Sequence, residues 1–112
     1  MTRKEIASTI AGIGLPFAYD HFSDMDGAHP QGPPFICFLY PSRDDFMADD
    51  TNYVKITDLV IELYTDQVDF GLEDTVEAAL TASGLVYSKD QIYLDGERMY
   101  QTTYTSEVCI NG

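Results

Sequence analysis

Residues 49–66 read DDTNYVKITDLVIELYTD, an acidic stretch that leads into the longest β-branched and aromatic run of the chain and ends in an acidic turn. Such side chains suit a pleated, half-buried surface, so the run predicts a long central strand. Its alternation contains one fault, because apolar residues stand at even positions up to Ile56 and at odd positions from Leu59 onward. A β-bulge near residues 57–58 would produce this change of phase. A strand that is apolar on both faces, between helices and a partner, would produce it too.

Length and composition predict a single globular domain that comprises residues 1–112. The hydrophobic fraction is 45%, and a chain of 112 residues buries one core without metal or disulfide bonds. No apolar run approaches the roughly 20 residues that cross a bilayer, so we expect no membrane partner. The amino terminus leads into an amphipathic segment and not into a signal-peptide core, which predicts that the protein starts in a cytoplasm.

The chain is strongly acidic, with 19 acidic against 6 basic residues and a formal charge of −13. Nucleic-acid binding needs clustered Lys and Arg on the phosphates, so this balance argues against it. Two interpretations remain open. The acids keep a small protein soluble, or they line a surface past which a polyanion slides without sticking.

Two helices are predicted. Thr2 and Glu5 form a capping box before isoleucines at helical spacing, which predicts a helix over residues 3–11. Asp69 is suited to cap a second helix, over about residues 71–83. The first half of that helix holds acids, which the helix dipole favours there: Glu73, Asp74 and Glu77.

Extended segments account for the rest of the chain. Strands are predicted at residues 17–22, 35–40, 53–65, 85–94 (interrupted near Asp90) and from 97 onward, with a hairpin turn at Asp95-Gly96. Residues 23–34 and 42–52 are predicted to be loops. The order α-β-β-β-α-β-β predicts an α+β fold, in which a mainly antiparallel sheet of four to five strands carries two helices on one face.

No catalytic, cofactor-binding or metal-binding constellation emerges from the residue types. His21 lies in a predicted strand and His29 in a loop, and neither has a partner at useful spacing. Residues 24–27, Asp-Met-Asp-Gly, are similar to the opening of a calcium loop, but neither register supplies the ligands. Cys37 and Cys109 form no zinc motif, and we expect buried free thiols, with a bridge between neighbouring strands as the alternative. We therefore expect that the protein is not an enzyme.

Several short segments carry a resemblance that covers nearly the whole length: residues 15–19, 33–35, 46–50, 53, 55–56, 61–66 and 97–101. The chain resembles the small tail-terminator, tail-completion or head-to-tail joining proteins of long-tailed, non-contractile bacteriophages and prophages. The resemblance implies an α/β subunit of a hexameric ring in the virion. That ring would cap the tail tube and contact the head connector, and DNA would pass through it without specific binding. It also implies a role in assembly in the host cytoplasm, without catalytic residues.

A cyclic ring needs heterologous contacts, in which one surface meets a different surface on the next copy. Phe46 and Met47 lie in the predicted loop of residues 42–52, and exposed apolar residues in a loop often pack on a partner. The candidate interface consists of Phe46, Met47, Asp49, Asp50 and Tyr53. Tyr100 and Tyr104 join it only if the sheet face opposite the helices is not core.

Two other functions compete with assembly. An acidic DNA mimic or inhibitory module would occupy a basic partner site, but its acids should gather on one convex face. Here the acids are scattered over loops, turns and the second helix. A small hydrolase or other enzyme would need a nucleophile and a base, and the sequence pairs none.

Overall fold

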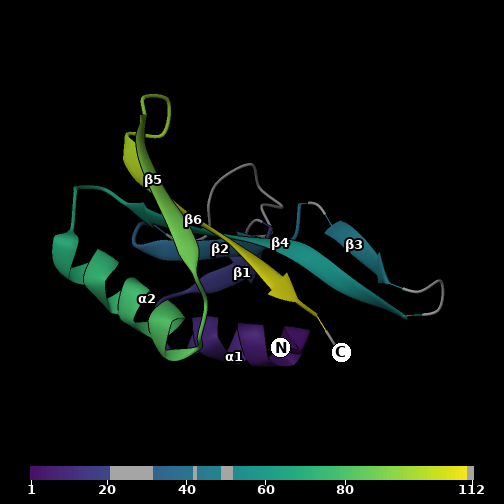
Figure 1. The fold of residues 1–112 in the computed structure, drawn as a ribbon. Coiled ribbons are helices and arrows are strands. Elements are labelled where there is room, and N and C mark those ends of the chain that lie inside the picture. Colours follow the sequence, from purple (N-terminus) through teal and green to yellow (C-terminus); the bar gives the residue numbers. More distant parts are fainter. Residues whose placement is uncertain (21–31, 42, 49–51, 111–112) are drawn as a thin grey trace.

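The computed structural model describes residues 1–20, 32–41, 43–48 and 52–110, and at 43–48 and 52–55 only the backbone. The elements follow the order α1 (Arg3–Ala11), β1 (Phe17–Tyr19), β2 (Phe35–Leu39), β3 (Arg43–Ala48), β4 (Asn52–Thr65), α2 (Phe70–Ala82), β5 (Tyr87–Leu94) and β6 (Met99–Cys109). Figure 1 shows one sheet with both helices on the same side. The α+β class and its mainly antiparallel sheet are confirmed, and the predicted order is found with one short strand more.

The predicted central strand is β4. It pairs with β2 and β3 along one edge and with β6 along the other, in the sheet order β1-β2-β4-β6-β5. Its register with β6 runs without interruption from Ile56↔Cys109 to Thr65↔Tyr100. The bulge predicted near residues 57–58 is therefore wrong. Thr57, only 5% exposed, continues the inward-facing row that Leu59 belongs to, so a polar residue in that row caused the apparent change of phase.

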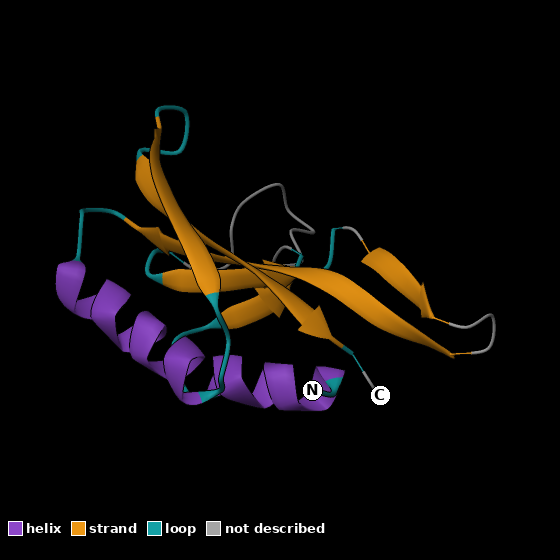
Figure 2. Ribbon diagram, in the orientation of Figure 1, coloured by secondary structure: helices purple, strands orange, loops and turns teal. Residues whose placement is uncertain are grey.

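Both helices pack on one face of the sheet, as Figure 2 shows (helices purple, strands orange). The predicted capping box is present, because the Glu5 N–H donates to Thr2 Oγ1 and the Thr2 N–H donates to Glu5 Oε1. At α2 the Asp69 side chain accepts from the Leu72 N–H at 3.0 Å, as predicted for its cap. Gly84, at φ +79°, ends α2 in the left-handed conformation that glycine adopts without strain.

The main core lies between the helices and the sheet. It consists of Ile6, Ile10, Ile36, Phe38, Leu59, Ile61, Leu63, Val76, Leu80, Leu85, Tyr104, Val108 and Ile110. A smaller cluster of Phe35, Cys37 and Met99, with Tyr64 and Leu94 against it, lies on the opposite face of the sheet. Tyr104 is 1% exposed on the helix side, so it belongs to the core and not to an interface.

Three strand predictions need correction. Residues 43–48 form β3 and not a loop, because the long β4 supplies backbone hydrogen bonds to them. A Phe-Met pair beside two aspartates does not by itself predict a strand. β5 runs through Asp90 without the predicted interruption, since β6 pairs with it residue by residue from Ser106 to Met99. β1 spans only Phe17–Tyr19 and runs parallel to β2, which makes the sheet mixed.

The hairpin turn predicted at Asp95-Gly96 is confirmed between β5 and β6. The Arg98 N–H donates to the Leu94 carbonyl at 2.8 Å, and Arg98 adopts φ +54° at the end of the turn. Several residues of the sequence analysis lie outside the described part of the chain: His21, His29, Asp49, Asp50 and residues 24–27. None of the described helices has the length and apolar character needed to span a membrane.

Candidate assembly surfaces

The predicted interface residues fall on a two-stranded ribbon. β3 pairs with the first part of β4, and this pairing sets Phe46 opposite Val54 and Met47 opposite Tyr53. Three of the five predicted residues, Phe46, Met47 and Tyr53, are thereby placed within two adjacent rungs. The other two predicted residues lie outside the described part of the chain.

The ribbon extends beyond the rest of the sheet. The pairing of β4 with β6 begins at Ile56, so residues 52–55 have β3 as their described strand partner. In Figure 1 the ribbon projects past the helices, at the end of the molecule near the amino terminus. An isolated two-stranded ribbon is only marginally stable in water, so contact with another chain would stabilise it.

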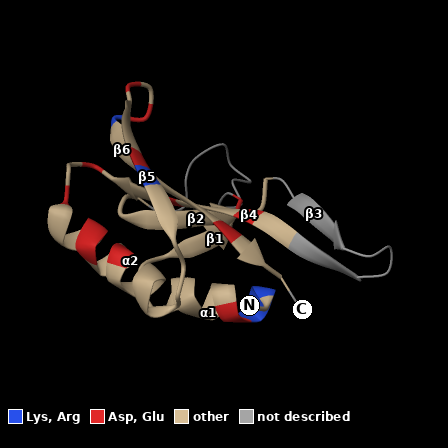
Figure 3. Cartoon of the chain, viewed as in Figure 1, with Lys and Arg blue, Asp and Glu red and all other residues tan. Residues whose placement is uncertain are grey.

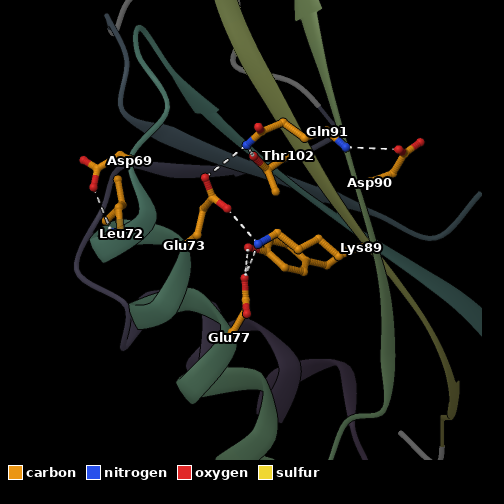
Figure 4. Close-up of polar contacts among 9 residues, drawn as sticks. Asp69, Leu72, Glu73, Glu77, Lys89, Asp90, Gln91 and Thr102 are labelled. Carbon is orange, nitrogen blue, oxygen red and sulfur yellow. Dashed lines mark hydrogen bonds and ion pairs between the residues drawn. The ribbon is translucent and has the colours of Figure 1, made fainter.

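A second feature is a polar cluster between α2 and the β5–β6 hairpin (Figure 4). Glu73 is buried on the inner side of α2, with a side chain 4% exposed. Lys89 Nζ lies 2.7 Å from Glu73 Oε1, and Gln91 Nε2 donates to Glu73 Oε2 at 3.0 Å. Gln91 Nε2 also donates to Thr102 Oγ1 at 2.7 Å. Both carboxylate oxygens of Glu73 are therefore satisfied, as a buried charge requires.

Glu77, one helical turn later, completes this cluster. Lys89 Nζ lies 2.7 Å from Glu77 Oε2, and the Tyr104 hydroxyl donates to the same oxygen at 2.9 Å. The hydrogen bond from Lys89 holds the pKa of Glu77 below its usual range. The bonds to Glu73 and Glu77 raise the pKa of Lys89, and burial raises the pKa of Tyr104. The pair of Lys89 and Glu77 therefore stays ionised near neutral pH.

A smaller polar group lies on the helix-free face of the sheet. The Tyr64 hydroxyl donates to Glu62 Oε1 at 2.9 Å, and Gln101 Nε2 donates to Glu62 Oε2 at 3.1 Å. Burial, followed by the nearby Glu62 carboxylate, raises the pKa of Tyr64. Glu62 accepts both hydrogen bonds, so this group joins β4 to β6 on the helix-free face.

Among the residues that the structure describes, no group of three or more His, Cys, Asp or Glu is placed to hold a metal ion. Neither Cys37 nor Cys109 forms a disulfide bond. Cys37 is buried as expected, but Cys109 is exposed, so the expectation of burial is wrong for Cys109. β6 ends at Cys109, where the side chain points away from the helix-side core.

The sequence analysis missed the polar cluster. The sequence pattern related Glu73 and Glu77 only to the helix dipole, whereas in the structure Val76 and Leu80 are buried on the inner side of α2. Glu73 lies three residues before Val76 and Glu77 three before Leu80, which are neighbouring positions on a helix surface. The signal was therefore present, but its partner Lys89 comes from a strand that only the tertiary fold places opposite.

The fold can be compared with known proteins. No family model matches the chain, and no curated protein matches it. Among solved structures, a chain described as "Virion of native gene transfer agent (GTA) particle" is similar, with a TM-score of 0.56 and 19% identity. The match covers 95% of this chain and 86% of that chain. At this identity the likeness establishes a shared α+β fold over nearly the whole length.

Proposed function

We propose that this chain is a structural protein of a phage or phage-like particle. The observation that carries the proposal is the fold shared over 95% of the chain with a component of a gene transfer agent virion. The finer assignment, a subunit that completes the tail tube and joins it to the head connector, is supported by the sequence resemblance in segments such as residues 46–50 and 61–66. On this proposal the protein acts through assembly and catalyses no reaction.

The mechanism we infer is head-to-tail association of copies into a ring, most simply a hexamer. Such a ring requires two different surfaces on each copy. The ribbon of β3 and β4 offers one, with Phe46, Met47 and Tyr53 close together in its register. The outer strands of the described sheet order, β1 and β5, present backbone donors and acceptors to a neighbour. The other partners would be the tail tube protein and the connector, with DNA passing through the lumen.

The distribution of charge bears on the alternative of a DNA mimic. Acidic residues among those described lie on α2, in the β5–β6 turn and on β4, β5 and β6 (Figure 3, red). The strand acids Asp58, Glu62, Asp90 and Glu107 share the helix-free face of the sheet, whereas α2 carries its acids on the other side of the sheet. A mimic of a phosphate array needs its carboxylates in one ordered, convex set. The scattered arrangement favours a subunit whose acids oppose the binding of DNA in general.

Negative-stain imaging of purified tail tubes, with and without the protein, tests this function. We expect a ring at one end of each tube in the mixture and bare ends on tubes alone. Tubes that stay bare while the protein binds a nucleic-acid-binding host protein in a one-to-one complex would reject assembly in favour of the inhibitory module.

A further inference from the structure

Exposed apolar side chains gather at one end of the molecule, opposite the ribbon. Phe70, the first residue of α2, is 73% exposed, and Val68 in the preceding loop is 40% exposed. Tyr93 on β5 is 47% exposed, and its ring lies 4.9 Å from that of Tyr100 on β6. We call Val68, Phe70, Tyr93 and Tyr100 the end patch.

The polar cluster explains why these residues share one end. Glu73 on α2 contacts Gln91 on β5. Phe70 lies about one helical turn before Glu73, and Tyr93 lies two residues after Gln91. One helical turn rises about 5.4 Å and two strand residues span about 6.8 Å, so Phe70 and Tyr93 lie at similar distances along their elements from the Glu73–Gln91 contact. Towards this end of the molecule α2 and the β5–β6 hairpin diverge, as Figure 1 shows. α2 therefore does not extend over Tyr93 and Tyr100.

The chain segments that carry the end patch are rich in carboxylates. Exposed acids occur in the segments that carry it: Asp66, Asp69, Asp74, Asp95 and Glu97. Arg98 is the one exposed base in residues 66–74 and 91–100, all of which the structure describes. On such a surface the aromatic side chains supply affinity through apolar contact, and the acidic side chains select a partner of positive charge.

We propose that the end patch docks a segment of a different protein that presents apolar or aromatic side chains flanked by Lys and Arg. Charge complementarity selects this occupant. A second copy of this chain, with a formal charge of −13, would add negative charge to an acidic surface. The inference does not depend on ring formation, because it rests on the exposure, position and charge of these residues alone.

The test uses the full chain and two synthetic peptides, one of alternating leucine and lysine and one with glutamate in place of lysine. Isotope-labelled protein is titrated and followed by NMR. We expect the lysine peptide to bind, with shifts concentrated at residues 66–70 and 91–101, and the glutamate peptide not to bind. Phe70→Ser should weaken binding about tenfold, the effect of losing a central aromatic anchor. Val86→Ser is the matched control, because Val86, just before β5, is 87% exposed at the end of that strand far from the patch.

Contrary outcomes are equally specific. Shifts spread over the acids of the whole molecule, equal affinity of Phe70→Ser and the wild type, or no binding of the lysine peptide would each overturn the proposal. Sedimentation that shows a dimer of the wild type, but not of Phe70→Ser, would assign the patch to a second copy instead. Thermal melting checks that Phe70→Ser folds. Tyr93→Ser serves as a second variant with the same expected loss.

Discussion

Glu73 shows how a single residue joins two parts of this fold. Its carboxylate is buried under the sheet and receives Lys89 from β5, whose side chain is 37% exposed, together with Gln91 from the same strand. A buried ion pair adds little net stability over an apolar pair of the same shape, whereas removal of one partner is costly. Its main effect here is to fix the position of α2 relative to the β5–β6 hairpin.

Lys89→Met tests this position directly. The substitution leaves the Glu73 carboxylate buried without its cation, and we expect a loss of about 2 kcal/mol in the free energy of unfolding. Urea denaturation measures the loss. Lys4→Met, at an exposed lysine on α1, should change stability by less than about 0.5 kcal/mol. The double variant Glu73→Gln/Lys89→Met should lose less than the sum of the single variants. Additive losses would show that the pair is not coupled.

Glu77 makes stability depend on acid pH. Its pKa in the folded protein is below the usual value near 4.5, because Lys89 and Tyr104 stabilise the carboxylate. As the pH falls, the unfolded chain therefore takes up this proton first. The contribution of Glu77 is fully present above the unfolded pKa and is lost as the pH falls through the folded pKa. Melting temperatures of the wild type and Glu77→Gln should differ most near about pH 6 and converge towards about pH 3. A constant difference would contradict the assignment.

At the scale of elements, the ribbon differs from every other part of the sheet. At residues 60–64, β4 lies between β2 and β6 and carries core residues on its helix side. Its first residues, 52–55, are paired only with β3 among the described strands. One strand thus serves as the centre of the sheet at one end and as half of a projecting ribbon at the other.

Phe46→Asp should separate folding from assembly. On the proposed function, a charge on the ribbon blocks ring formation on tail tubes while the melting temperature changes by only a few degrees. Sedimentation with tubes and circular dichroism are the two measurements. Val86→Asp, at an exposed site just before β5, should leave assembly intact. If Phe46→Asp unfolds the protein instead, Phe46 belongs to a core and the ribbon is not the interface.

At the scale of the whole molecule, net charge opposes self-association. Each copy carries a formal charge of −13, so on the proposed function neighbouring copies in a ring would repel one another. Screening weakens this repulsion, because the Debye length shortens as salt is added. Binding of a cationic segment at the end patch should weaken as salt is added, because screening also weakens the attraction between opposite charges.

Ring formation should therefore increase when NaCl is raised from about 0.05 M to about 0.3 M, whereas binding of the leucine–lysine peptide should weaken. Sedimentation velocity follows the first change and the NMR titration the second. Rings that dissociate on addition of salt would show that attraction between opposite charges, and not apolar and backbone contact, holds the copies together.

The amino-acid sequence by itself determined those features that arise from neighbours along the chain. These features are the capping box at Thr2, the cap at Asp69, the turn at Asp95-Gly96 and the course of β4. They follow from hydrogen bonds and alternation within a few residues. The α+β class followed from the order of these elements. Short-range interactions can be predicted from the sequence because both partners of each interaction lie within a few residues of each other.

Only the tertiary structure decided which distant residues meet. β3 is a strand because β4 supplies its hydrogen bonds, and Glu73 is buried because β5 brings Lys89 and Gln91 to it. The end patch is exposed because α2 and the β5–β6 hairpin diverge towards that end of the molecule (Figure 1). The partners in these features are separated by loops and whole elements, so their pairing depends on how the complete sheet and its helices pack.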